Sequence, residues 1–231
     1  MVYALILAGG TGTRVGGDMP KQFLPLGGVP LLARTLAAFE KHLLVDGIFL
    51  AAPPALLEES REIAAAITKL VEVLPGGETR QDSCRLALEG MAAHMGKGDM
   101  ILIHDGARPF VDGETIGRCI HTVKEQGAAN TVYPQENTIL LSRDGIMMDT
   151  VPDRDTCYTV QTPQGFFFAE LLEAHRRCAA MASPPLFTDD CTLYAAMLQK
   201  PVYLCMGTKE NIKITTRADF WAGEAYLAQG K

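Results

Sequence analysis

The sequence predicts an α/β fold in which helices cover both faces of a mostly parallel, Rossmann-like sheet. Two observations carry this prediction: short apolar runs alternate with segments of helical periodicity, and no internal repeat or linker divides the chain. A third observation is one polar stretch, at about 134–160, that interrupts the alternation. We therefore expect a single domain over residues 1–231 that carries a β-arm at about 134–160.

Strands are expected at short runs rich in valine, isoleucine and leucine, because the strands of a parallel sheet are buried on both faces. They are predicted at 2–7, 47–52, 71–74, 100–104, 128–133, 202–206 and 212–215. Helices are predicted between and after them, at 31–42, 56–70, 81–95, 115–126, 168–181, 190–198 and 218–227. Right-handed crossovers would place the loops after these strands along one edge of the sheet, where ligands of such sheets bind.

The interrupting stretch contains two strand-like pieces, 138–142 and 146–150, on either side of Asp144-Gly145. Asp-Gly between such pieces is a strong signal for a β-hairpin. Because a projecting hairpin has little core of its own, we expect it to contact a second subunit as a dimerisation arm. A mobile surface hairpin is the alternative.

The composition narrows the classes of partner. A formal net charge of −6 argues against binding a nucleic-acid backbone through bulk electrostatics. No apolar run approaches the roughly 20 residues that cross a bilayer, and the run at 3–8 is too short for a signal peptide. We therefore expect a cytoplasmic protein that contacts neither membrane nor nucleic acid. The six cysteines include no Cys-x-x-Cys pair and the five histidines are scattered, so no zinc site is predicted.

A glycine-rich loop follows the first predicted strand. With the strand end, its residues are Leu7, Ala8, Gly9, Gly10, Thr11, Gly12, Thr13 and Arg14. Glycines let the backbone approach a ligand and direct N–H groups at phosphate oxygens, while Arg14 and Lys21 supply the positive charge that a triphosphate requires. A dinucleotide fingerprint requires glycine where Val15 stands, and a P-loop requires glycine where Pro20 precedes the lysine. Both of these alternatives therefore fail.

Two further loops follow predicted strands. The segment 76–83 leads into a helix, whose free N–H groups and Ser83 hydroxyl suit a base or ribose; simple capping of that helix is the alternative. The segment 104–109 places Asp105 beside Gly106, with Arg108 three residues on. This pattern suits binding of a metal or hydroxyl beside a phosphate, and a salt bridge at the sheet edge is the alternative for Arg108.

Basic and hydroxyl residues in the C-terminal half complete the set. Arg154 lies on the predicted arm, from which it would reach the site of a neighbouring subunit. Lys213 lies in an otherwise apolar run, where a lysine requires an anionic partner. Thr188 precedes Asp189 and Asp190, which we interpret either as part of this group or as caps of the following helix.

In combination, these motifs resemble the sugar-phosphate cytidylyltransferases over essentially the whole chain. That family includes the enzymes for 2-C-methyl-D-erythritol 4-phosphate and for ribitol 5-phosphate. The resemblance implies transfer of CMP from CTP to a small polyol phosphate, with pyrophosphate released and Mg²⁺ as cofactor. It also implies a sheet of the nucleotide-diphospho-sugar transferase type and a homodimer that exchanges its arm.

The resemblance also implies roles for residues. Arg14 and Lys21 match transition-state stabilisers, and Arg154 and Lys213 match residues that position the acceptor phosphate. CTP is expected to contact residues 7–13 and, in the second loop, Gly77, Glu78, Arg80 and Ser83. The acceptor is expected to contact Asp105, Gly106, Arg108, Thr138 and Thr188. Asp105 is also the expected protein ligand of Mg²⁺.

Two acceptors fit the motifs. Residues 77–83 and 104–109 are similar to the methylerythritol enzyme, whereas residues 19–24 and 151–155 are similar to the ribitol enzyme. In addition, Asn137 stands where an aspartate is usual before the threonine, here Thr138. We expect methylerythritol 4-phosphate because it is the more widespread role in bacteria, with ribitol 5-phosphate as the alternative. A non-catalytic CTP-binding regulatory protein is a remote alternative, against which the presence of all four basic residues argues.

Overall fold

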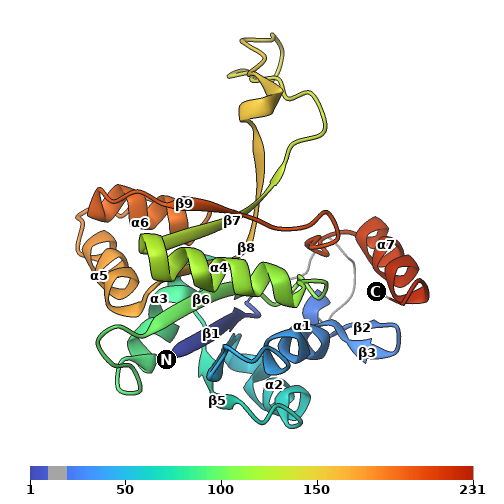
Figure 1. Cartoon of the computed structure of the whole chain (residues 1–231), viewed down its shortest axis with the longest axis vertical. Coiled ribbons are helices and arrows are strands. Elements are labelled where there is room, and N and C mark those ends of the chain that lie inside the picture. Colours follow the sequence, from blue (N-terminus) through green and yellow to red (C-terminus); the bar gives the residue numbers. More distant parts are fainter. Residues whose placement is uncertain (10–19, 231) are drawn as a thin grey trace.

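The central sheet forms the middle layer of the molecule (Figure 1). The computed structural model describes residues 1–9 and 20–230. Within these residues, seven strands form one sheet in the order β5-β4-β1-β6-β8-β7-β9. They are β1 (Val2–Leu7), β4 (Gly47–Ala52), β5 (Leu70–Pro75), β6 (Met100–Asp105), β7 (Ala128–Pro134), β8 (Tyr158–Phe167) and β9 (Tyr203–Met206). Because β8 alone among them runs antiparallel to its neighbours, the prediction of a mostly parallel sheet is confirmed.

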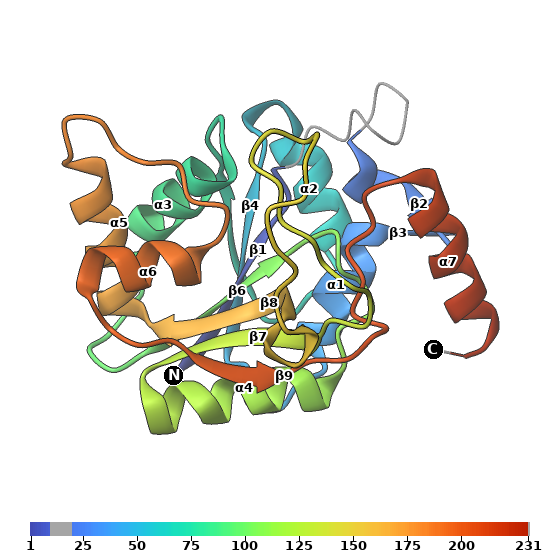
Figure 2. The same ribbon diagram turned by 90° about the horizontal axis from the view of Figure 1, so that it is seen from above.

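Helices cover both faces of this sheet (Figure 2). The α-helices in the described part of the chain are α1 (Leu31–Glu40), α2 (Leu57–Ala64), α3 (Arg80–Met91), α4 (Gly113–Gln126), α5 (Phe168–Ala179), α6 (Asp190–Leu198) and α7 (Arg217–Ala228). Short 3₁₀ helices are η1 (Lys21–Phe23), η2 (Pro54–Leu56) and η3 (Arg154–Thr156), and β2 (Pro25–Leu26) pairs with β3 (Val29–Pro30).

The alternation of side chains along β1 assigns these helices to two layers. Leu5 lies in a core cluster with side chains of α3, α5 and α6, whereas Ile6 lies in a second cluster with side chains of α1, α2 and α4. Helix α7 lies apart from both and packs Gly223 against Leu26 and Phe110. No helix in the described residues is long and apolar enough to cross a membrane.

The predicted elements are recovered with small shifts at their ends, apart from one helix, one strand near the C-terminus and the two strands of the arm. The helix predicted at 56–70 ends at Ala64, because the Glu40 carboxylate accepts hydrogen bonds from the N–H groups of Thr68 and Lys69, at 3.2 and 3.0 Å. The strand predicted at 212–215 is wrong. The Ile214 N–H donates instead to the Ala107 carbonyl at 2.9 Å, so this segment runs along a loop.

Strand β8 was not predicted. Its polar residues, among them Gln161, Thr162 and Gln164, are buried, and Pro163 and Gly165 interrupt any apolar run. These residues are buried because β8 lies between β6 and β7, where its polar groups find hydrogen-bond partners.

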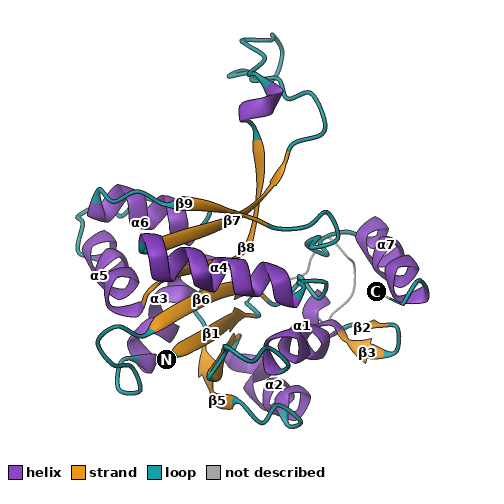
Figure 3. Cartoon of the chain, viewed as in Figure 1, coloured by secondary structure: helices purple, strands orange, loops and turns teal. Residues whose placement is uncertain are grey.

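The chain between β7 and β8 extends away from the sheet (Figure 1), and it is drawn mostly as loop in Figure 3. We call residues 135–157 the arm. Of the two strands predicted in it, only one bridge forms, between Leu141 and Thr150. All residues from 140 to 151 are exposed. The role of the arm in dimerisation stays a prediction.

Candidate functional site

Loops that follow four parallel strands meet at one edge of the sheet. Leu7, the last residue of β1, pairs with Asp105, the last residue of β6. The Gly106 N–H donates to the Leu7 carbonyl at 2.9 Å, and the Gly76 N–H after β5 donates to Ala52 at the end of β4 at 2.7 Å. The sequence therefore brings the first, second and third predicted loops together, as the rule for open parallel sheets requires.

The glycine loop and the second loop touch through Ser83. A Cβ on Gly9 would lie 3.1 Å from the Ser83 Oγ, and one on Gly76 would lie 3.0 Å from it, so only glycine fits easily at these two positions. Ser83 Oγ also accepts from the Gly77 N–H at 3.0 Å and donates to the Thr79 carbonyl at 2.8 Å. Ser83 is thus a structural centre for both loops expected to hold CTP.

The helix that follows is capped independently of Ser83. Thr79 Oγ1 accepts from the Asp82 N–H at 3.0 Å, which satisfies one free donor of α3. Capping therefore accounts for Thr79, whereas Glu78 is exposed at the rim of the loop.

The third loop presents a buried carboxylate to three cations. Asp105 Oδ1 lies 3.3 Å from Arg80 Nε, while Asp105 Oδ2 lies 3.4 Å from Arg108 Nε and 2.9 Å from Lys213 Nζ. We call Asp105, Arg80, Arg108 and Lys213 the Asp105 cluster. Burial opposes ionisation of Asp105, but the charges of Arg80, Lys213 and Arg108 outweigh it and hold the pKa of this carboxyl well below its usual range.

A buried histidine fixes the loop that carries Asp105. His104 Nε2 contacts the Arg108 carbonyl at 3.1 Å, and its Nδ1 contacts Thr162 Oγ1 at 3.0 Å. Thr162 Oγ1 also accepts from the Asp105 N–H at 3.1 Å. Burial lowers the pKa of His104 to about 4, so the ring is neutral at pH 7 and its Nε2–H can donate to the carbonyl.

Lys213 reaches the cluster from a segment held by side-chain hydrogen bonds. Asn211 Nδ2 donates to the Thr162 carbonyl at 2.8 Å, and the Asn211 carbonyl accepts from Arg108 Nη1 at 2.8 Å. The predicted anionic partner of Lys213 is therefore found, and it is Asp105.

Arg80 also contacts a second buried carboxylate. Its Nη1 donates to Asp190 Oδ2 at 2.7 Å, and Asp190 Oδ1 lies 3.0 Å from His175 Nε2. Sequence reasoning had left Asp190 open as a possible cap and missed His175. The cap of α6 is Asp189, whose Oδ1 accepts from the Thr192 N–H at 2.9 Å. The signal in the sequence for a separate role of Asp190 is that it directly follows an aspartate that already caps the helix.

Among the described residues, Cys84, His175 and Asp190 could together hold a metal ion, since their donor atoms lie within 4.8 Å of one another. Burial raises the pKa of the Cys84 thiol well above its usual range, so at pH 7 it is protonated and is not the thiolate that binds metal ions. We therefore interpret the three residues as a hydrogen-bonded network. Asp105 is the better candidate for Mg²⁺, because Mg²⁺ is commonly bound by one or two carboxylates together with substrate phosphates, and the phosphate charge would offset the three cations beside Asp105.

Other predicted site residues lie away from this cluster or outside the described residues. Thr138 and Arg154 are exposed on the arm, and no contact between described residues joins them to the Asp105 cluster. Thr188 is exposed just before α6. Lys21 is buried in η1, which is fastened to the end of β1 by a hydrogen bond from Gln22 to the Ala8 carbonyl.

The side chains of Leu7 and Ala8 are buried, which leaves their backbone to contact a ligand. The remaining residues of the first loop lie outside the described residues: Gly10, Thr11, Gly12, Thr13 and Arg14.

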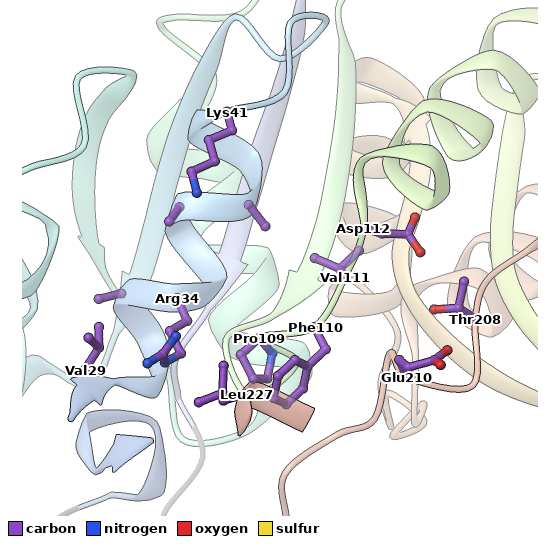
Figure 4. Close-up of a pocket in the computed structure, with 13 residues that line it drawn as sticks. Val29, Arg34, Lys41, Pro109, Phe110, Val111, Asp112, Thr208, Glu210 and Leu227 are labelled. Carbon is purple, nitrogen blue, oxygen red and sulfur yellow. The ribbon is translucent and has the colours of Figure 1, made fainter. Parts of the chain in front are cut away.

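A cavity of about 580 Å³ lies elsewhere, between α1, α7 and residues 109–112 (Figure 4). None of the predicted site residues lines it. Two of its polar side chains serve the fold: Arg34 donates to the Leu26 and Gly27 carbonyls, and Asp112 accepts from the Thr115 N–H as the cap of α4. Eight of the thirteen residues that line the cavity are apolar, so it suits a triphosphate less well than the edge of the sheet does.

Comparison with known proteins gives one consistent result. Residues 2–229 match the family model described as 2-C-methyl-D-erythritol 4-phosphate cytidylyltransferase. The chain is 39% identical to the protein of that name from Geobacter metallireducens, over 99% of this chain and 98% of the relative.

Solved structures agree with this result. A crystal structure of 4-diphosphocytidyl-2C-methyl-D-erythritol synthase from Anaerococcus prevotii superposes with a TM-score of 0.85 at 27% identity, covering 98% of this chain and 96% of the other. The 2-C-methyl-D-erythritol 4-phosphate cytidylyltransferase of Thermus thermophilus superposes with a TM-score of 0.76 at 34% identity, covering 99% and 100%.

Proposed function

This chain belongs to the 2-C-methyl-D-erythritol 4-phosphate cytidylyltransferase family, and we propose that its Asp105 cluster carries out the reaction of that family. CMP is transferred from CTP to the phosphate of 2-C-methyl-D-erythritol 4-phosphate, and pyrophosphate is released. The observation that carries the proposal is the convergence of Arg80, Arg108 and Lys213 on Asp105. This convergence lies at the edge of the sheet where β1 ends and the glycine loop begins.

The chemistry requires positive charge more than it requires a base. An acceptor phosphate oxygen attacks the α-phosphorus of CTP, a new P–O bond forms, and the bond from the α-phosphorus to the bridging oxygen breaks as pyrophosphate leaves. The attacking oxygen is already anionic, so no side chain has to remove a proton. Catalysis then consists of positioning the two substrates and stabilising negative charge.

The cluster can supply this positive charge because carboxylates offset the mutual repulsion of its cations. Three cations, Arg80, Arg108 and Lys213, face two carboxylates, those of Asp105 and Asp190, which leaves a net charge of +1 in the network. Asp105 holds Arg108 and Lys213 in place before any substrate binds. An incoming phosphate would share these cations, with Arg14 and Lys21 acting on the triphosphate.

Mg²⁺ would be held by Asp105, with the triphosphate and water supplying the other ligands. When bound, the ion neutralises phosphate charge and favours departure of pyrophosphate. Asp105 is suited to this role because its pKa is held below the usual range, so the carboxylate is ionised at pH 7. The residues of the chain bind and orient the substrates.

The arm would complete the site of a second subunit in a homodimer. Support comes from its exposed apolar side chains: Leu140, Ile146, Met147 and Met148 are between 56% and 87% exposed. Apolar residues gathered on a projecting segment are typical of an interface. Arg154 and Thr138 would then contact the acceptor bound beside the partner's Asp105 cluster.

The test is release of pyrophosphate from CTP and Mg²⁺ with each of two acceptors. We expect fast release with 2-C-methyl-D-erythritol 4-phosphate and at least a hundredfold lower kcat/KM with ribitol 5-phosphate, because the names of the relatives favour the first acceptor. Faster release with ribitol 5-phosphate would reassign the acceptor. CTP binding without release in either case would contradict the proposal.

A further inference from the structure

Asp190 is buried in the protein without being needed as a helix cap. It is the first residue of α6, and only 1% of its surface is exposed. Its neighbour Asp189 provides the capping hydrogen bond to the Thr192 N–H. A buried carboxylate that caps nothing is unfavourable unless other groups pair with it, so its partners indicate its purpose.

Those partners lead directly into the site. Asp190 Oδ2 accepts from Arg80 Nη1 at 2.7 Å, and Asp190 Oδ1 contacts the buried His175 Nε2 at 3.0 Å. The other side of the same guanidinium contacts Asp105 Oδ1, through Nε at 3.3 Å. Arg80 therefore bridges two carboxylates, and its contact with Asp190 is the shorter of the two.

Arginine suits this bridge because its planar group presents several donors in a fixed geometry, which a lysine ammonium does not. The side chain is long, and without an anchor it would sample several rotamers. Asp190 supplies that anchor from α6, whereas Arg80 begins α3, so the contact also ties together two helices on the same face of the sheet.

We propose that Asp190 is a positioning residue for the transfer reaction: it holds the Arg80 guanidinium against Asp105 and so keeps the Asp105 cluster in its productive arrangement. The inference rests on the proposed function. Asp190 itself does not touch substrate, and its whole effect on turnover passes through Arg80.

A double-mutant cycle tests this directly. The variants are Asp190→Asn, Arg80→Met and the double variant, each assayed for pyrophosphate release with CTP, Mg²⁺ and 2-C-methyl-D-erythritol 4-phosphate. We expect Asp190→Asn to lower kcat by about 10- to 100-fold, since small misplacements in an active site have effects of this size. In the Arg80→Met background, Asp190→Asn should change kcat by less than about twofold, because the group that it positions is gone.

Asp189→Asn is the matched control, because it lies next to Asp190 and asparagine also caps helices well. Its kcat should stay within about twofold of the unaltered protein. Thermal unfolding is measured for every variant. If Asp190→Asn alone does not fold, the comparison of Arg80→Met with the double variant can still overturn the inference, because a further loss there would show an effect of Asp190 that does not pass through Arg80.

Three results would overturn the inference. They are an unchanged kcat for Asp190→Asn, an unchanged kcat for Arg80→Met, and a further loss above about fivefold on adding Asp190→Asn to a folded Arg80→Met variant. Absence of pyrophosphate release by the unaltered protein would instead contradict the proposed function, so the two failures are distinguishable.

Discussion

The Asp105 cluster and the arm differ in how their charged residues are held. In the cluster, Asp105 is 7% exposed and has three cationic partners, all between 2.9 and 3.4 Å. On the arm, the Arg143 guanidinium is 95% exposed and its contact with Asp149 measures 3.8 Å. The cluster is fixed by its own chain, whereas the two halves of the arm are joined by one β-bridge and a few further contacts.

This difference indicates what positions the charged side chains in each region. Strand ends and helix starts fix the cluster, so its charges are placed before a substrate arrives. The arm has no comparable network within its own chain, so any precise role for Arg154 requires a second surface.

The largest effect is expected for Lys213→Ala. Removing this cation from the site should lower kcat/KM for the acceptor by about 10²–10³-fold, the range found when one charge-stabilising donor is lost. Steady-state release of pyrophosphate measures it. Lys209→Ala is the control, because Lys209 is an exposed lysine on the same segment that pairs with Glu136. Equal losses for the two lysines would contradict the role of Lys213.

A second prediction concerns pH and the buried His104. Its pKa is lowered to about 4 in the folded chain, so between roughly pH 6.5 and 4 the unfolded chain binds a proton that the folded chain does not. Stability therefore falls as pH drops through this window, by about 2 kcal/mol from pH 7 to 5. Urea unfolding of His104→Gln, which keeps a donor and an acceptor, should show a smaller loss. The same pH slope in both proteins would refute the assignment.

On the arm, Arg154→Ala should weaken use of the acceptor. We expect KM for the acceptor to rise about tenfold with KM for CTP unchanged, as for loss of one exposed phosphate contact. Initial rates with each substrate varied in turn measure both constants. Arg143→Ala is the matched control on the same arm, and an effect of similar size there would indicate general electrostatics rather than a specific contact.

The smallest effect is expected for Ile146→Ser, which replaces an apolar side chain that is 87% exposed. If a partner subunit covers this residue, the substitution should raise the dimer dissociation constant by about fivefold, which corresponds to about 1 kcal/mol of lost apolar burial. Analytical ultracentrifugation measures it. Leu43→Ser, at a position that is 95% exposed before β4, should leave the constant unchanged. No shift for Ile146→Ser would argue that the arm does not form the interface.

The same two regions show what the sequence could and could not predict. Strands β1 and β4 and helix α6 were predicted to the residue, because buried parallel strands and capped helices leave strong local patterns. Lys213 was correctly expected to need an anion, since a lysine in an apolar run is conspicuous. In contrast, the sequence does not predict the pair of Asp190 and Arg80, which lie 110 positions apart, and His175 gains its role only through its contact with Asp190.

Strand β8 was not predicted, again because the partners of its side chains lie on other segments of the chain. Its buried polar residues are satisfied by neighbours that only the folded sheet supplies, such as Asn130 for Gln164 at 3.0 Å. The strands predicted within the arm did not form beyond one bridge, since local hairpin propensity lacks packing support there.

The most direct test of a site shared between two subunits combines two weakened variants in one dimer. Lys213→Ala and Arg154→Ala chains, carrying different tags, are produced together and the mixed dimer is isolated. If the rigid cluster of one subunit works with the arm of the other, one site in each mixed dimer has both residues intact. With the acceptor well below its KM, where both parent variants are slow, the mixed dimer should then release pyrophosphate at roughly half the rate of the unaltered dimer. A rate no higher than the mean of the two parent variants would contradict the account.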